Sequence, residues 1–280
     1  MNAKETLKKL HENEQSLFIV HYSCQNLNDN NENYSPRITS IAVLHVGSST
    51  MHSFSIHLIA EVKKIPREDI HEHYDDLEKE MLAQFFSFVS ENDNGFWLHW
   101  NMSNINYGFE ALIHRYKVLS GVDGKRISDS KKFNLSSLIL SIYGKNCVEH
   151  PRMASFMKLN DGEHRDGLTG KEEVDAFAAK EYVKLHKSTM CKAYWFQHMY
   201  YLLQRNKVSV HNRNWGNKVN TFLERPTVKA LGFVAVLFSL LQAVQYGYSS
   251  IELEEKDKPK TVHEQMRKSS NTDEDNSTSS

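Results

Sequence analysis

The sequence has few of the residues that define small secreted, zinc-ribbon or fibrous proteins. Its three cysteines, Cys24, Cys147 and Cys191, lie far apart and form no CxxC pair. A disulfide framework or a zinc ribbon is therefore not expected, and reduced thiols in a cytosolic setting are favoured. With only 5 prolines and 12 glycines among 280 residues, fibrous and low-complexity classes are excluded.

An excess of charge of one sign is also missing. The chain has 34 Lys and Arg against 35 Asp and Glu, which argues against a protein that binds nucleic acid or an acidic membrane along its whole length. P-loop, GxSxG and HExxH motifs are absent, so we expect neither a cofactor nor a metal site. The polar N-terminus MNAKETLKKLHENEQ has no apolar run, and a secretory signal peptide is not expected.

Residues 17–165 predict an α/β domain with a mixed sheet. The predicted strands are rich in β-branched and aromatic residues, and the predicted helices carry apolar residues at helical spacing. In chain order we expect a polar arm at 1–16, strands at 17–22, 38–46 and 52–59, a helix at about 68–91, a strand at 96–100 and a helix at about 105–119. The order β-β-β-α-β-α predicts a three-stranded meander that continues into a mixed sheet.

Long helices are expected to follow. A short apolar helix is predicted at Leu135–Tyr143, and a helical segment at 171–224. Neither Gly nor Pro interrupts this segment before about Asn206, so it holds one long helix or two abutting ones. The tail at 252–280 is acidic and rich in Ser, Thr and Asn, and we expect it to be disordered.

A single apolar segment precedes the tail. From Ala230 to Ile251, 22 consecutive residues carry no charge, and about 20 suffice to cross a bilayer. Its large apolar residues each favour insertion by about 0.3–0.6 kcal/mol, opposed by Gln242 and Gln245. We predict a transmembrane helix at 228–251; the alternative is a buried core helix.

One face of this segment predicts self-association. Small residues recur every four positions, and two glutamines add amides that need partners within hydrocarbon. The predicted packing face consists of Ala235, Ser239, Gln242, Ala243, Gln245 and Gly247. The expected partners are the membrane and further copies of this chain, although small residues are also common in membrane helices by composition. Flanking charges and the missing signal peptide favour a single-pass inner-membrane protein with a cytoplasmic N-terminal domain.

Residues 17–180 resemble DEDD-type exonucleases of RNase H-like fold. The stretch FIVHYSCQNL at 18–27 resembles their opening strand, and FWLHWNMSNINYGFEALIHRY at 96–116 is similar to their second motif. The resemblance implies metal-binding carboxylates near Tyr22 and Cys24 and near Asn106, where this chain has none. Only Glu172, Glu173 and Asp175 could supply the carboxylate of the third motif. Two-metal hydrolysis needs several carboxylates, so we expect a binding or sensing domain without catalytic residues.

Other polar clusters are weaker candidates. His99, Trp100, Asn101 and Asn104 follow the strand at 96–100, at a sheet end where α/β proteins often bind ligands. His45, His52 and His57 lie on neighbouring predicted strands, where they converge or simply face solvent. His71, Glu72 and His73 have side chains that bind metals, but on a helix they would point apart. Lys184, His186, Lys187, Ser188 and Lys192 form a basic stretch that contacts a partner or is merely solvated.

These features together predict a membrane-anchored effector that is not an enzyme. Its sensor domain would bind a nucleoprotein or regulatory protein, while its C-terminal helix self-associates and disrupts the membrane. This plan is similar to the transmembrane effectors of bacterial anti-phage abortive-infection systems, including those paired with retrons. Two alternatives remain: a membrane-tethered nuclease that uses Glu173, Asp175 and His186, and an anchored adaptor whose helix is only a tether.

Overall fold

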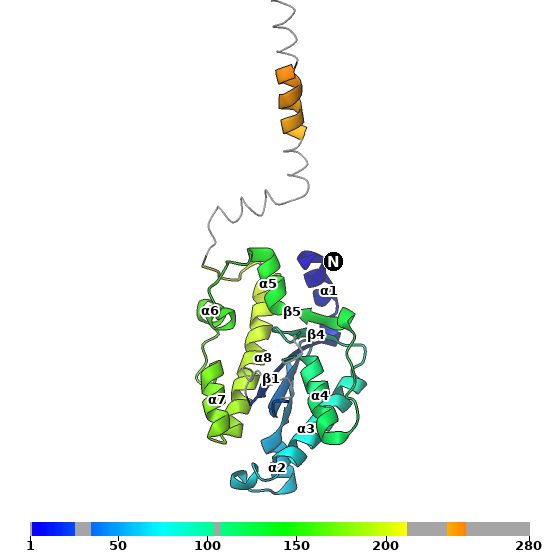
Figure 1. Ribbon diagram of the computed structural model, residues 1–280, viewed down its shortest axis with the longest axis vertical. Helices are drawn as coiled ribbons and strands as arrows, with labels where there is room; N and C mark the ends of the chain where they lie inside the picture. Colours follow the sequence, from blue (N-terminus) through cyan, green and yellow to red (C-terminus); the bar gives the residue numbers. More distant parts are fainter. Residues whose placement is uncertain (1, 26–34, 104–106, 212–233, 245–280) are drawn as a thin grey trace, which may run out of the picture. The chain divides into compact units, whose positions relative to one another are not determined.

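The computed structural model describes residues 2–25, 35–103, 107–211 and 234–244. Within them, five strands form one mixed sheet in the order β3-β2-β1-β4-β5 (Figure 1). The strands are β1 (Leu17–Cys24), β2 (Ile38–His45), β3 (Thr50–Ser55), β4 (Phe96–His99) and β5 (Lys132–Asn134). β1 pairs antiparallel with β2 and parallel with β4. The predicted α/β domain with a mixed sheet is therefore confirmed.

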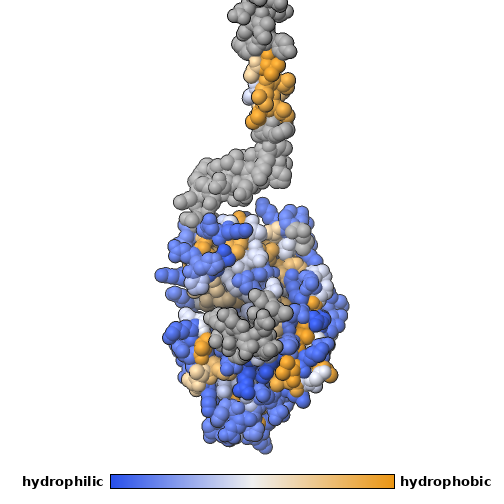
Figure 2. Space-filling view, in the orientation of Figure 1, coloured by the Kyte–Doolittle hydropathy of each residue, from blue (hydrophilic) through white to orange (hydrophobic). Residues whose placement is uncertain are grey.

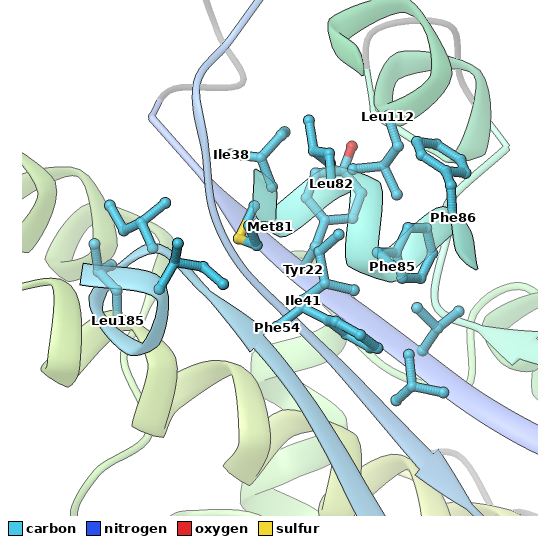
Figure 3. Close-up of a cluster of buried hydrophobic side chains, with 14 of the residues drawn as sticks. Tyr22, Ile38, Ile41, Phe54, Met81, Leu82, Phe85, Phe86, Leu112 and Leu185 are labelled. Atoms are coloured by element: carbon cyan, nitrogen blue, oxygen red, sulfur yellow. The ribbon is translucent and has the colours of Figure 1, made fainter. Parts of the chain in front are cut away.

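Helices cover both faces of this sheet (Figure 1). Phe18, Val20 and Tyr22 of β1 pack in a core with helices α2 (Ile56–Lys63), α3 (Tyr74–Glu91) and α4 (Phe109–Ser120). Figure 3 shows Tyr22 in this core among Met81, Leu82 and Phe85 of α3. The alternate residues of β1 face α8 (Tyr182–Gln204). Because β1 is covered on both sides, nearly all its residues are buried.

A buried ion pair joins α3 and α4 to the start of β2. The Glu78 side chain is fully buried, and its Oε1 accepts hydrogen bonds from the Ile38 amide at 2.6 Å and from Arg115 Nε at 2.9 Å. Its Oε2 accepts a second bond from Arg115 at 2.6 Å. The pair satisfies both charges inside the protein and fixes where β2 begins.

Two predicted boundaries are wrong. The strand expected at 52–59 ends at Ser55, and α2 begins at Ile56, because Ile56, Ile59 and Ala60 are buried together at helical spacing. The helix expected from about 68 begins at Tyr74, after a turn of 3₁₀-helix. Two helices therefore separate β3 from β4, and the order is β-β-β-α-α-β-α.

The helices after β5 belong to the same compact unit as the sheet, residues 1–217. Helix α5 (Leu135–Tyr143) has the predicted bounds, and α6 spans Arg152–Leu159. The segment from 171, for which one long helix or two abutting ones were predicted, contains two: α7 (Gly170–Ala178) and α8. α8 packs along β1 and β2, so this segment, to Gln204, is part of the α/β domain rather than an addition to it.

Residues 234–244 are helical and belong to a second unit. All of their side chains are exposed, and most are apolar (Figure 2). The Ser239 hydroxyl donates to the Ala235 carbonyl at 2.9 Å. Among the described residues, no helix is both long and apolar enough to span a bilayer. Most of the transmembrane helix predicted at 228–251, including Gln245 and Gly247, lies outside the described residues, as does the tail at 252–280.

Candidate functional site

A cavity of about 390 Å³ lies where the parallel strands β1 and β4 end. Its lining comes from β1, the residues after β4, the approach to α4, and helices α6, α7 and α8. The lining residues are His21, Tyr22, Ser23, Cys24, Trp100, Asn101, Tyr107, Met153, Gly170, Glu173, Val174 and Lys192. Ligands of α/β proteins commonly bind at this end of a sheet, so this cavity is the candidate site.

A lysine and a glutamate form the charged part of the site. Lys192 of α8 is 5% exposed, and its ammonium donates to Oε1 of Glu173 in α7 at 2.7 Å. The same oxygen accepts from the hydroxyls of Ser188 at 3.1 Å and Ser23 at 3.3 Å. The carboxylate is thus held against β1, and its charge is balanced by the ammonium.

A hydrogen-bond chain fixes the tautomer of His21. The Tyr107 hydroxyl donates to the Tyr22 carbonyl at 3.2 Å and lies 3.2 Å from His21 Nδ1. Because that hydroxyl has one proton, His21 Nδ1 must carry its own proton and donate to the Tyr107 oxygen. His21 Nε2 is then a buried acceptor without a partner among the described residues. Burial and the Lys192 charge hold the pKa of His21 well below its usual value, so the ring is neutral.

The thiol of Cys24 is also neutral. Burial raises its pKa to about 12, assisted by the negative charges of Glu173 and Glu78. A protonated thiol is a poor nucleophile and a poor metal ligand. The cavity therefore offers one balanced carboxylate, aromatic rings and neutral polar groups. Within the described part of the chain, no three His, Cys, Asp or Glu side chains are grouped to hold a metal ion.

The cluster predicted after the strand at 96–100 is divided by the structure. Trp100 and Asn101 line the cavity, and Asn101 Oδ1 accepts from the Asn134 amide at 3.0 Å. His99 lies elsewhere: its ring packs on Phe109, and Nδ1 accepts from the Met102 amide at 3.0 Å. Burial, with a smaller effect of Lys132, lowers the pKa of His99 to about 4. Asn104 lies outside the described residues.

The other predicted clusters have different outcomes. His45 and His52 line one cavity at the opposite end of the sheet, whereas His57 lies on α2 with its ring 5.1 Å from that of His186. The basic stretch of α8 is not a surface patch, because His186, Ser188 and Lys192 are buried under the sheet face. The prediction of a shared solvated or partner-binding surface is therefore wrong for these three residues, whereas Lys184 and Lys187 are exposed.

Within the predicted membrane packing face, Ala235, Ser239, Gln242 and Ala243 are described, and they are exposed on one helix.

The sequence did not lead us to assign Ser23, Tyr107 or Met153 to a site. Tyr107 precedes α4 in the stretch that resembles the second exonuclease motif, and this position was the signal in the sequence that could have assigned it to the site.

Comparisons with protein-family models, with curated proteins and with solved structures find no significant match for this chain.

Proposed function

We propose that this chain is a membrane-anchored protein whose α/β domain binds a ligand without hydrolysing it. The observation that carries the proposal is the Lys192 ammonium, 2.7 Å from Glu173, the one carboxylate among the described residues that line the cavity. A metal ion at this carboxylate would have to displace a buried lysine. This would cost the energy of the ion pair and of desolvating the charges in the site.

The antiparallel meander of β1, β2 and β3 fits the resemblance to DEDD-type exonucleases. At the end of β1, where the resemblance implies carboxylates, the chain has Tyr22, Ser23 and Cys24. Glu173 lies beside Ser23, which is where a third-motif carboxylate would be needed. With a single, neutralised acid, the site suits recognition and not two-metal hydrolysis.

The alternative of a divergent nuclease that uses Glu173, Asp175 and His186 receives less support. The Asp175 carboxylate is exposed and pairs with Lys171 at 3.3 Å. His186 is buried against β2, where Nδ1 lies 2.6 Å from the Ser40 hydroxyl. The three side chains have separate partners, so they do not form a shared metal site.

We further propose that the ligand is a nucleic-acid end, free or within a nucleoprotein, and that its binding controls the C-terminal segment. Tyr107, which is half-buried at the cavity, offers a ring for base stacking, and a phosphate would compete with Glu173 for the Lys192 ammonium. The apolar side chains of 234–244 support membrane association. In this proposal the segment self-associates through Ala235, Ser239 and Ala243 and disrupts the membrane, as an anti-phage effector would.

Binding without cleavage is tested with the full chain in nonionic detergent and labelled single-stranded DNA and RNA oligonucleotides. We expect a rise in fluorescence anisotropy with intact oligonucleotide in Mg²⁺ or Mn²⁺. Lys192→Met should weaken binding, whereas Lys184→Met, an exposed lysine of the same helix, should not. Cleavage that needs a metal and is lost in Asp175→Asn would refute the proposal in favour of a nuclease.

The membrane step is tested by recording the membrane potential of cells that express the full chain or a chain ending before Pro226. Depolarisation by the full chain alone is expected, and Ser239→Leu with Ala243→Leu should abolish it while the protein stays in the membrane. If an inert Leu/Ala helix can replace 228–251 without loss of function, the segment is only a tether and the chain is an adaptor.

A further inference from the structure

We propose that the cavity at Glu173 selects the 3′ end of an RNA and binds it through the two hydroxyls of the terminal ribose. This selectivity rests on the proposed function, since it states which nucleic-acid end the site takes. It follows from the hydrogen bonds that the lining residues leave unmade and from the charge that they carry.

The two oxygens of the Glu173 carboxylate have different surroundings. Oε1 accepts from the Lys192 ammonium at 2.7 Å and from the hydroxyls of Ser188 at 3.1 Å and Ser23 at 3.3 Å. Oε2 has no donor among the described residues. The Glu173 side chain is 17% exposed, and Oε2, unlike His21 Nε2, is not shut off from solvent. Oε2 is therefore a fixed acceptor that can take a donor from an occupant of the cavity.

The charge of the lining disfavours a terminal phosphate. Lys192 is the one cation among the described lining residues, and Glu173 already balances it. His21 adds no positive charge, because burial and the Lys192 charge hold its pKa well below the usual value. A phosphate would have to displace Glu173 from Lys192 and would leave the carboxylate without its counter-ion. A group that donates hydrogen bonds without bringing charge avoids both costs.

The vicinal diol of a ribose is such a group. Carboxylates of nucleotide-binding α/β proteins accept hydrogen bonds from ribose hydroxyls, and each carboxylate oxygen has lone pairs for two donors. The 2′-hydroxyl is also what distinguishes RNA from DNA. In an uncapped RNA both hydroxyls of one ribose are free only at the 3′ end, because a phosphodiester bond takes up every other 3′ oxygen.

The cavity has space for a terminal nucleoside beside this carboxylate. Its volume of about 390 Å³ lies within the range of about 300–1,000 Å³ that is usual for small-ligand sites. Gly170 also lines the cavity, and it precedes Glu173 by three residues on α7, so the two lie on the same side of the helix. A Cβ added at Gly170 would meet no atom within 4 Å. The space next to Glu173 is therefore open.

Selectivity is tested by fluorescence anisotropy with the full chain in nonionic detergent and EDTA. One short RNA, labelled at its 5′ end, is prepared with a 2′,3′-diol, a 2′-deoxy or a 3′-phosphate terminus. We expect the diol to bind about tenfold more tightly than the 2′-deoxy end, the loss expected for one hydrogen bond to a charged acceptor, and the 3′-phosphate to bind most weakly. Equal affinities for the three ends, or for DNA of the same sequence, overturn the selectivity and leave the proposed function in place. If no oligonucleotide binds, both are refuted.

Glu173→Gln should change the preference for the end. The amide carbonyl of the glutamine can still accept from Lys192, which places an NH₂ donor where Oε2 was and leaves the ammonium without a counter-ion. The diol end should therefore bind about tenfold more weakly than to the wild type, and the 3′-phosphate end more tightly. Asp175→Asn removes an exposed acid of the same helix and should change neither affinity. Wild-type affinities in Glu173→Gln, with the fold intact by circular dichroism, overturn the selectivity.

A second variant tests the site with the ion pair left in place. In Gly170→Leu the new side chain would fill the open space beside Glu173, and binding of the diol end should weaken severalfold. Gly170→Ala adds only a methyl group and should weaken binding less. A Gly170→Leu protein that is folded and binds the diol end like the wild type would show that the terminal ribose lies elsewhere.

Discussion

The Lys192 ammonium donates a hydrogen bond of 2.7 Å to the carboxylate of Glu173, joining two helices at the end of the central strand β1. The side chains of the pair are 6% and 17% exposed. Such an ion pair contributes to stability chiefly through the cost of breaking it, since either charge alone would be left largely buried without a counter-ion. The same pair removes the negative charge on which a metal ion would depend.

Replacing one member of this pair should therefore lower the free energy of unfolding more than replacing both members does. We expect Lys192→Met to lower the free energy of unfolding by about 3 kcal/mol, because Glu173 loses its counter-ion. Adding Glu173→Gln should recover most of that loss. Urea unfolding followed by tryptophan fluorescence measures both effects. The control is Lys184→Met, which breaks an exposed pair with Glu181 and should cost less than about 1 kcal/mol. Additive losses in the double variant would contradict this account.

The reactivity of the Cys24 thiol depends on the negative charge of Glu173. Burial and the charges of Glu173 and Glu78 raise its pKa to about 12, so at pH 8 iodoacetamide should alkylate it slowly. Glu173→Gln removes one negative charge and should speed alkylation several-fold, since each unit of pKa is worth tenfold in thiolate. Peptide mass spectrometry gives the rate.

Two controls belong to this measurement. The fully buried Cys147 reports unfolding, so its alkylation rate should stay constant in the variant. Asp175→Asn removes an exposed acid of the same helix and should leave the Cys24 rate unchanged. If Cys24 reacts equally fast in the wild type and in Glu173→Gln, the carboxylate does not govern the thiol.

Tight packing at Gly124 gives a prediction about stability. A Cβ at this residue would lie 2.5 Å from the Phe86 ring, so Gly124→Ala should destabilise the fold by about 1–3 kcal/mol through overpacking. Gly170, the first residue of α7, has nothing within 4 Å of its added Cβ. Gly170→Ala should be neutral or slightly stabilising, since alanine favours helix. A thermal-unfolding midpoint unchanged by Gly124→Ala would show that Phe86 can move aside.

Much of the fold could be predicted from local patterns. Apolar spacing predicted α5 with its observed bounds, and it also predicted the strand at the start of the meander. The prediction of a strand at 52–59 was wrong at its end. Ile56 and Ile59 are β-branched, as is typical of strands, but their spacing also fits a helix. The break between α7 and α8 falls at Lys180, which adopts a positive φ of 60°. Without Gly or Pro there, the sequence could not decide between one helix and two.

The site was only partly predictable. Glu173 was one of three acids, with Glu172 and Asp175, that the resemblance to exonucleases left as candidates, but its pairing with Lys192 depends on how α7 packs against α8. His99 and Trp100 were grouped because they are adjacent in sequence. Successive side chains of a strand point to opposite faces, so this error could have been avoided from the sequence itself. The cavity lined by His45 and His52 joins residues of α3 to three strands, and only the tertiary fold brings them together.

Buried neutral histidines predict a loss of stability in acid. Burial lowers the pKa of His186 and of His99 from 6.5 to about 4; for His186 the charge of the neighbouring His57 contributes less. Between pH 6.5 and 4 the unfolded chain binds protons that the folded chain does not. The contribution of these histidines to the free energy of unfolding is therefore fully present above this window. It is lost as the pH falls through the window.

The contribution of His186 can be isolated from this slope. Each such histidine adds at most about 1.4 kcal/mol per pH unit, so His186→Asn should reduce the slope between pH 6 and 5 by up to that amount. The asparagine amide can still bond to the Ser40 hydroxyl, 2.6 Å from His186 in the native protein. His198→Asn, an exposed histidine of the same helix, should leave the slope unchanged. Urea unfolding at closely spaced pH values measures the slope, and equal slopes for the wild type and His186→Asn would show that His186 takes up its proton without unfolding.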